Sequence, residues 1–246
     1  MQDGFYLDGY VYHMTHFDTL KSILRTRSLL SKERVFAENL GSRSIANGDV
    51  QNLRDRIYIW DVSQGRPRPL HSYVPFYFAK LTPMLYVQRQ DGLQGEIIFF
   101  EVSRSIVNDF GVIFTDGNVT IQQLAKFGTE RVLVIPATVT KPSCERQYTS
   151  AIPQGTNYNC SNVYSGSVFL ENLDWTLVNN DRWGRDPEKK RIKHAEVLVP
   201  DIVPLSKIEG ISTMTKEKAD EVNVLIRQCG LAGRIPGAIS NPDLYF

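Results

Sequence analysis

Hydrophobic positions recur with two different periods along this chain, which indicates a mixture of short strands and helices. Residues 10–14 form an apolar run that predicts a strand, and a helix is expected to follow. Its apolar stripe consists of Leu20, Ile23 and Leu24, with Leu29 or Leu30 a turn later. Thr15 and Asp18 precede the stripe as candidate helix caps. This unit would direct backbone N–H groups and the positive end of a helix dipole toward a ligand above His13.

Stretches rich in polar residues, glycine and proline separate the other apolar runs. Residues 31–56 predict a long loop with a short helix near residues 49–56, and residues 61–69 predict a second loop. Aromatic and β-branched runs predict further strands. We expect these strands at residues 73–78, 84–88, 96–102, 112–115, 131–138, 195–199 and 208–211.

Helices are few in this pattern. One is expected at residues 173–180, and a closing helix is expected where Gly230 is positioned as its cap. The apolar face of that closing helix consists of Ala219, Val222, Leu225 and Ile226. The sum is an α+β domain without regular βαβ alternation. Because the chain has neither GxGxxG nor GxxxxGK, the sequence does not favour a Rossmann or P-loop domain.

The chain of 246 residues fits one large domain, here taken as residues 1–246. Residues 141–167 are rich in Ser, Asn, Gly, Pro and Tyr and have little periodicity. Compact domains seldom carry such a long loop without a use, so this segment predicts a functional loop or an insertion.

Charge and cysteine content narrow the class of protein. The net charge is +1, whereas a protein that coats DNA without specificity usually carries a larger basic excess, so any nucleic-acid contact must be local. Cys144, Cys160 and Cys229 lie far apart and outside any CxxC motif, which predicts neither a disulfide framework nor a zinc site. Together with the lack of a signal-peptide pattern or a long apolar run, this favours a cytoplasmic protein without a membrane span.

His13 and His16 form an HxxH pair, the first candidate for chemistry. A strand followed by a turn rarely aims two such rings at one point, and no acidic third ligand lies nearby in the sequence. The pattern therefore does not favour a metal. A hydrogen bond to a cofactor, or a structural role, explains this pair better.

Glu196 is the most informative carboxylate, because it stands at the entry of the apolar run 195–199. Alternation alone places Glu196 opposite Ala195 and Val197, which favours an outward-facing residue on an edge strand. The alternative is a carboxylate held in a cleft beside a ribose, where it would stabilise an oxocarbenium-like centre. The pattern leaves both interpretations open.

Arg54 and Arg56 lie in the expected short helix near residues 49–56. Such arginines are often solvated or paired, but a guanidinium also matches two oxygens of a pyrophosphate at once. Residues 73–78 contain four aromatics, which fit core packing on one face and stacking on a planar ring on the other.

A basic run precedes Glu196 directly. It consists of Arg182, Arg185, Lys189, Lys190, Arg191 and Lys193, diluted by Asp181, Asp186 and Glu188. This run is typical of a solvated face, and its position also allows phosphate contacts near a catalytic centre.

Taken together and in order, three segments resemble the DarT family of DNA ADP-ribosyltransferase toxins. The first is residues 12–24 (YHMTHFDTLKSIL). The second runs from residue 43 through Arg54 to residues 70–78 (LHSYVPFYF) and 83–86 (PMLY), and the third is Trp183 followed by DPE and by residues 193–199 (KHAEVLV). The resemblance spans about residues 10–212 with gaps.

The resemblance implies roles for individual residues. His13 and Thr15 correspond to the strand that contacts NAD, and Tyr77 corresponds to an aromatic in the nicotinamide region. Arg54 corresponds to the arginine that orients NAD and assists proton removal from the acceptor base, and Glu196 to the catalytic glutamate. We also expect nucleic-acid contacts from His71, Met84, Arg182, Lys193 and His194.

The resemblance also implies an ADP-ribosyltransferase fold, with split and mainly antiparallel sheets around an NAD cleft. Its implied substrates are NAD and single-stranded DNA without a metal, and its implied partner is a macrodomain antitoxin, DarG. The segment at about residues 129–167 is longer than in compact members and lies where this fold places its substrate-recognition loop, so thymine and guanine both stay open as the acceptor.

Three rival functions are also open. The same chemistry can act on RNA or protein. A catalytically idle module on this fold would bind NAD or nucleic acid without releasing nicotinamide. A metal-dependent nuclease would need a cluster of acidic residues that this sequence does not display.

Overall fold

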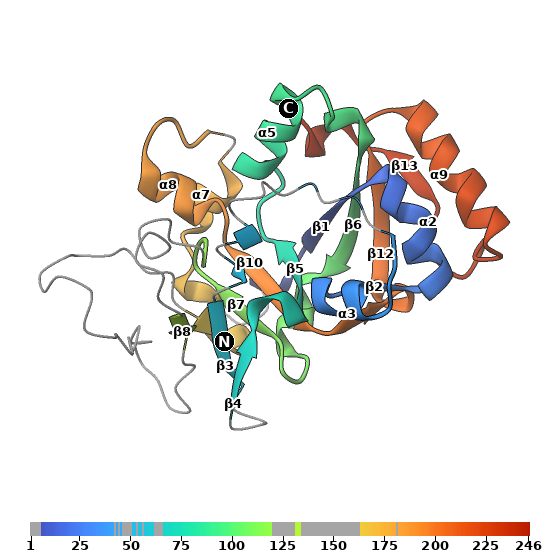
Figure 1. Ribbon diagram of the computed structural model, residues 1–246. Coiled ribbons are helices and arrows are strands. Elements are labelled where there is room, and N and C mark those ends of the chain that lie inside the picture. Colours follow the sequence, from blue (N-terminus) through green and yellow to red (C-terminus); the bar gives the residue numbers. More distant parts are fainter. Residues whose placement is uncertain are drawn as a thin grey trace, which may run out of the picture.

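A computed structural model describes residues 6–41, 43, 45, 51–52, 54–55, 57–61, 66–119, 131–133, 163–180 and 182–246. Within these residues the main sheet has eight strands in the order β13-β12-β6-β1-β5-β10-β7-β9 (Figure 1). The strands are β1 Tyr10–His16, β5 Tyr73–Tyr77, β6 Ile97–Ser103, β7 Ile113–Thr115, β9 Val163–Tyr164, β10 Glu196–Pro200, β12 Ile208–Thr213 and β13 Ala238–Ser240. The pairings are antiparallel except for β12 with β13.

The inner part of this sheet is covered on both faces. Ile97, Ile98, Phe99 and Phe100 of β6 are all fully buried. Ile98 and Phe100 belong to the core on the face of α2 (Phe17–Thr26) and α9 (Lys216–Gln228), whereas Ile97 and Phe99 pack with Leu85 of α5 (Pro83–Gln90). A strand buried on both faces is a continuous apolar run, as this one is. Figure 1 shows α2 and α9 together on one side of β6 and α5 on the other.

The helix α2 forms where the apolar stripe predicts it, with Leu20, Ile23 and Leu24 buried. Its cap differs from the prediction, because His16, and not Thr15 or Asp18, is the N-cap: His16 Nδ1 accepts from Asp18 N–H at 3.1 Å. Leu29 and Leu30 do not continue the stripe. Arg27 adopts a left-handed conformation that ends the helix, and both leucines lie in β2 (Ser28–Leu30), paired with β11 (Ile202–Pro204).

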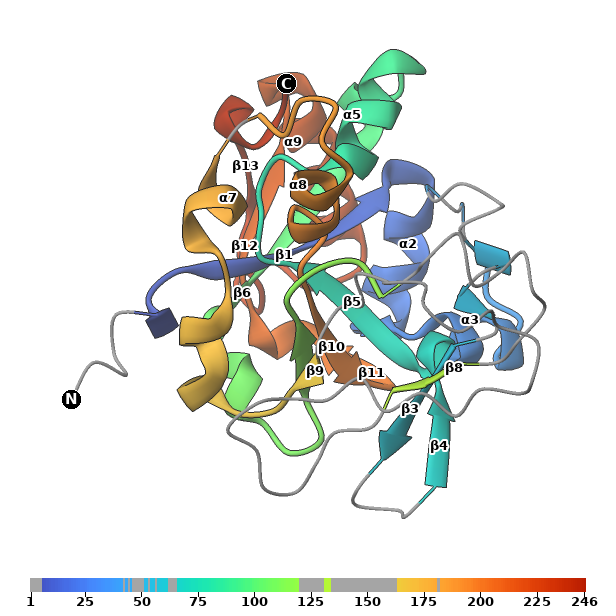
Figure 2. The same ribbon diagram turned by 90° about the vertical axis from the view of Figure 1, so that its left-hand side faces the viewer.

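The segment expected as a loop at residues 61–69 contains an antiparallel pair instead. β3 (Ile57–Asp61) pairs with β4 (Arg66–Pro69), and β8 (Arg131–Leu133) lies parallel to β3 on its other side. Figure 2 shows β3 and β4 side by side at the bottom of the view. β4 ends the strand order, so Pro67 and Pro69 lie on an edge strand, where the missing N–H groups of proline are tolerated.

The apolar run at residues 84–88 is also not a strand. It lies in α5, where the Thr82 side chain accepts from Leu85 N–H and Pro83 occupies the first turn. Threonine at the N-cap followed by proline is a strong helix-start signal, and it prevails over the β-branched and aromatic composition. A further helix, α3 (Lys32–Ala37), lies in the predicted loop 31–56.

Of the remaining α-helices, two lie at predicted positions and one forms where no helix was predicted. α7 (Trp175–Asn179) lies in the segment expected to be helical, α8 (Pro187–Ile192) forms in the charged run, and Gly230 follows α9 with a positive φ of 67°. The predicted insertion at about residues 129–167 lies largely outside the described residues. In the part of the chain that is described, no helix is long and apolar enough to cross a membrane.

Candidate active site at the split between β1 and β5

A split in the main sheet creates the site. β1 pairs with β6 along its whole length but with β5 only at Tyr12 and Tyr77. Phe78 N–H donates to the carbonyl oxygen of Ala195, the residue just before β10. Because the backbone groups of successive strand residues point to opposite sides, those of Tyr77 and Pro75 point toward β1. Pro75 has no N–H to donate there. Its carbonyl oxygen instead lies 2.8 Å from His13 Nδ1, so a side chain from β1 replaces the ladder at the split.

Glu196 begins β10 and lies directly opposite Tyr77 of β5. β10 is an inner strand between β5 and β7, and Glu196 is 1% exposed, so the outward-facing interpretation is wrong. The buried Thr115 at the end of β7 holds its backbone, since Thr115 Oγ1 accepts from Glu196 N–H at 3.3 Å and donates to Gly117 O at 2.8 Å. The carboxylate is therefore carried on a fixed backbone.

Arg54 meets this carboxylate from a distant part of the chain. Its Nη1 lies 3.1 Å from Glu196 Oε1, and its Nη2 lies 3.4 Å from Oε2. The two side chains are only 12% and 2% exposed. Burial opposes the charge of the guanidinium, but the Glu196 carboxylate outweighs it, so the pKa of Arg54 is raised. A two-oxygen contact with an arginine is among the strongest charge-assisted hydrogen bonds.

Tyr77 forms the wall next to this ion pair. Burial, and then the Glu196 carboxylate, raise the pKa of Tyr77, so its phenol stays protonated. Its hydroxyl donates to Met84 Sδ at 3.8 Å, and its ring centroid lies 6.2 Å from that of His194. Burial lowers the pKa of His194 from 6.5 to about 4. The site thus combines one carboxylate, one permanent cation and two uncharged rings.

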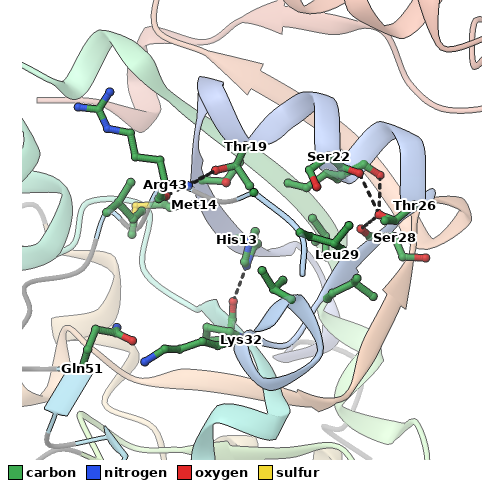
Figure 3. Close-up of a pocket in the computed structure, with 18 of the residues that line it drawn as sticks. His13, Met14, Thr19, Ser22, Thr26, Ser28, Leu29, Lys32, Arg43 and Gln51 are labelled. Atoms are coloured by element: carbon green, nitrogen blue, oxygen red, sulfur yellow. Dashed lines mark hydrogen bonds between the residues drawn. The ribbon is translucent and has the colours of Figure 1, made fainter. Parts of the chain in front are cut away.

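A cavity of about 500 Å³ lies beside Arg54 and Tyr77, which both line it. His13 and Thr15 line it from one face of β1, while Met14 and Tyr77 line it from the other face, so the cavity passes through the split. Figure 3 shows Arg43 beside Thr19 at one end, His13 in the middle, and Lys32 with Gln51 at the other end. A cavity of this size with a few convergent polar groups is typical of a ligand site.

Two cations of this cavity escaped sequence analysis. Lys32 lies at the start of α3, and Arg43 is held by Asp18 Oδ2 at 3.0 Å and by a bond from its own backbone N–H to Thr19 Oγ1. With Arg54 they give the cavity three cationic side chains. Lys32 lies in no motif, whereas Arg43 begins the second segment of the family resemblance but was not predicted to be a site residue.

A sequence model of the DarT family, described as ssDNA thymidine ADP-ribosyltransferase, matches residues 12–140 and 145–246. The chain belongs to the DarT family. The match covers all three segments on which the resemblance was based, so that prediction is confirmed.

Individual DarT-family proteins are similar over nearly the whole chain. The DNA ADP-ribosyl transferase of Thermus sp. strain 2.9 is 28% identical over an alignment of 247 positions, which covers 96% of this chain and 95% of that protein. The structure of Thermus sp. 2.9 DarT in complex with ADP-ribosylated ssDNA has a TM-score of 0.72 at 26% identity and covers 97% of this chain and 96% of that one. Its complex with NAD+ gives 0.68 at 25% identity, with 97% and 98% covered. These matches confirm the expected α+β ADP-ribosyltransferase fold.

His71 is placed differently from the other predicted nucleic-acid contacts. It lies in the 3-10 turn Leu70–Ser72, and its Nε2 is 2.6 Å from Oδ1 of Asp55. Lys32 Nζ lies 3.4 Å from the same carboxylate oxygen. Burial, and then the nearby cations Lys32 and Arg54, lower the pKa of His71, so the neutral ring donates this bond. In this DarT-family chain His71 therefore fastens the segment that carries Arg54.

Lys193 requires a correction. Its side chain is 2% exposed, and its Nζ lies 2.8 Å from Val178 O and 2.6 Å from Asn180 O. An ammonium that binds two carbonyl oxygens inside the protein cannot also reach a phosphate, so Lys193 is a structural residue that ties β10 to the end of α7. Arg182 is exposed, and Met84 lines the cavity beside Tyr77.

The histidine pair does not form a metal site. His13 binds the Pro75 carbonyl and His16 caps α2, so the two rings serve different elements. Over the described ranges, no group of three or more His, Cys, Asp or Glu side chains is suited to hold a metal ion.

Proposed function

We propose that this chain is an NAD+-dependent ADP-ribosyltransferase that attaches ADP-ribose to a base of single-stranded DNA. The observation that carries the proposal is the buried contact between Arg54 and Glu196 beside Tyr77. Arg54 and Tyr77 both line the cavity at the split in the sheet. The Thermus sp. 2.9 relatives, with NAD+ and with ADP-ribosylated ssDNA bound, support both substrates.

NAD+ is placed along the cavity, with its pyrophosphate among the cationic side chains and its nicotinamide ribose at Glu196. Arg54 is suited to both tasks, because its fork can hold a carboxylate or two phosphate oxygens. His13 and Thr15 form the wall that the dinucleotide follows. Tyr77 offers an uncharged ring to the nicotinamide region.

The reaction is a substitution at the anomeric carbon of the ribose. Glu196 hydrogen-bonds a ribose hydroxyl and stabilises the positive charge that develops as nicotinamide leaves. Its burial at 1% exposure makes this electrostatic effect stronger than it would be in water. A nitrogen of the acceptor base then attacks the same carbon.

The acceptor must be unpaired, because the reactive edge of a base is hidden in a duplex. Exposed Arg182 is placed to hold a strand phosphate, while Met84 and His194 lie beside Tyr77, where the base would enter. The family description names thymidine, so thymine is the base to test first and guanine the second.

Family membership also supports a biological role. We place residues 1–246 in one ADP-ribosyltransferase domain that acts as a toxin in the bacterial cytoplasm, where NAD+ and DNA occur together. The proposed partner is a macrodomain antitoxin of the DarG type. Residues 129–167 are proposed to form the substrate-recognition insertion.

Mass spectrometry of a short mixed-sequence oligonucleotide, treated with NAD+ and the protein, tests this function. We expect an ADP-ribose mass increment on one nucleotide, its persistence in a chelator, and its loss with Glu196→Ala. The control variant is Glu209→Gln, which changes an exposed carboxylate on β12. Modification of RNA or protein alone would replace the proposed acceptor, and NAD+ binding without nicotinamide release would identify an idle module.

A further inference from the structure

His194 lies beside Tyr77, the residue paired with Glu196. The ladder between β5 and β10 extends one residue before β10, because Phe78 N–H donates to Ala195 O at 3.2 Å. His194 comes directly before this pair and two residues before Glu196. Its ring contacts Tyr77, the residue that lies opposite Glu196 across the ladder. His194 and Glu196 thus flank the same tyrosine.

The hydrogen bond of His194 defines its tautomer. Nδ1 lies 2.9 Å from the carbonyl oxygen of Lys190, which can only accept a hydrogen bond. Nδ1 therefore carries the hydrogen, and Nε2 presents a lone pair on the other side of the ring. Among the described residues no hydrogen bond to Nε2 is found, and the His194 side chain is half-buried.

The surroundings keep this ring neutral. Burial first, and then the charged side chains of Lys190, Arg54 and Lys193, lower the pKa of His194 to about 4 against the opposing effect of the Lys190 carbonyl. At neutral pH the ring is therefore an acceptor and not a cation. Tyr77, the other ring that faces it, keeps its phenolic proton.

The transfer reaction needs such an acceptor. In thymine, the base that the family description names, the one ring nitrogen outside the glycosidic bond carries a hydrogen, and this proton has to leave when that nitrogen attacks. An arginine keeps its own proton in proteins, so Arg54 can assist proton removal through its charge but cannot receive the proton. Glu196 is held by Arg54 and is assigned to the ribose. Of the described side chains around Tyr77, His194 is the one with a free basic nitrogen.

Resting on the function proposed above, we propose that His194 is the general base of the reaction and therefore a catalytic residue. A bond forms between the base nitrogen and the anomeric carbon. The bond from that carbon to the nicotinamide nitrogen breaks, and its electron pair neutralises the pyridinium ring. The hydrogen on the attacking nitrogen passes to His194 Nε2, and the imidazolium then returns the proton to water.

The test compares His194→Ala and His194→Gln with the wild type in single-turnover transfer to an oligonucleotide. We expect both variants to be slower by about 10²- to 10⁴-fold, the range for loss of a general base. Added imidazole should restore His194→Ala, which leaves space for it, and not His194→Gln. Glutamine can still donate to the Lys190 carbonyl, so its loss of rate cannot come from a missing structural contact.

Three further measurements make the result decisive. NAD+ affinity should be unchanged in both variants. Their transfer rates should rise with pH more steeply than that of the wild type. Without His194 only those acceptor bases react that have already lost their proton to water, and their fraction increases with pH. Transfer by either variant within about threefold of the wild type, or no response of His194→Ala to imidazole, would overturn the role of His194. If the wild type itself transfers nothing to DNA, the proposed function fails instead.

Discussion

Arg54 and Glu196 are 142 positions apart in the sequence, yet Nη1 of the arginine lies 3.1 Å from Oε1 of the glutamate, with both side chains nearly buried. Because both side chains are nearly shielded from water, each charge is stabilised mainly by the other. The ion pair therefore joins two tasks, because the groups assigned to NAD+ also hold the Arg54 segment against the main sheet.

Glu196→Gln should abolish transfer and also weaken the fold. Removing one partner leaves the guanidinium without a counter-charge in a poorly hydrated place, and we expect the free energy of unfolding to fall by about 2–3 kcal/mol. Denaturant unfolding of Glu196→Gln, Arg54→Gln and the double variant measures this. If the double variant loses as much as the sum of the single variants, the two residues are not coupled.

Thr115→Val should lower the turnover number with little change in NAD+ affinity. The hydroxyl accepts from Glu196 N–H and donates to Gly117 O, so its loss frees the backbone under the carboxylate. We expect a loss of about 1–2 kcal/mol in stability. Thr115→Ser keeps the hydroxyl and serves as the matched control; if serine is as slow as valine, packing and not the hydrogen bond is responsible.

Lys193→Met and Arg182→Gln should separate a structural cation from a DNA contact. Lys193→Met should reduce stability, because two carbonyl oxygens lose their donor, and should leave the salt dependence of DNA binding unchanged. Arg182→Gln should leave stability unchanged and reduce the slope of log affinity against log salt by about 1. Titration with a single-stranded oligonucleotide at several salt concentrations measures this slope for each variant. If the slope is the same for both variants, Arg182 does not contact DNA.

His194 should also make the fold sensitive to acid. The folded protein keeps this ring neutral down to a pKa of about 4, whereas the unfolded chain binds the proton near the ordinary value of 6.5. The unfolded state therefore binds more protons between these values, and stability falls as the pH drops through this window. Since each pKa unit corresponds to about 1.4 kcal/mol, we expect about 3 kcal/mol from this group.

His194→Gln should flatten that part of the pH dependence, as measured by unfolding at several pH values. The wild type and the variant share His13, whose pKa is also lowered by burial, so their difference isolates residue 194. Parallel curves for the two proteins would show that His194 has an ordinary pKa in the folded state.

Sequence patterns predicted the parts of the fold in which local and tertiary signals agree. Strand β1, the stripe of α2 and the cap after α9 are of this kind. The run at residues 84–88 was misread because its composition favours a strand, while the capping Thr82 and Pro83 begin a helix. The prolines of β4 hid a strand whose position at a sheet edge makes them harmless.

The site was predictable only as a set of motifs. Alternation gave the wrong orientation for Glu196, because it assumes one solvated face, whereas the strand is an inner one in a sheet covered by helices. Lys193 was misassigned because charge alone does not tell a solvated ammonium from one that binds carbonyls within the protein. Lys32 reaches the cavity through the path of the chain, which no local pattern encodes. Arg43 stands in a segment of the family resemblance, but that resemblance predicted no role for it.

Pro75 has a consequence for how the cavity meets its substrate. A strand residue without an N–H leaves the gap between β1 and β5 open by covalent structure, and the His13 bond to its carbonyl bridges the gap without closing it. The recess is therefore preorganised. A dinucleotide that enters need not break backbone hydrogen bonds between two strands, and its contacts can be used for orientation instead of for separating the sheet.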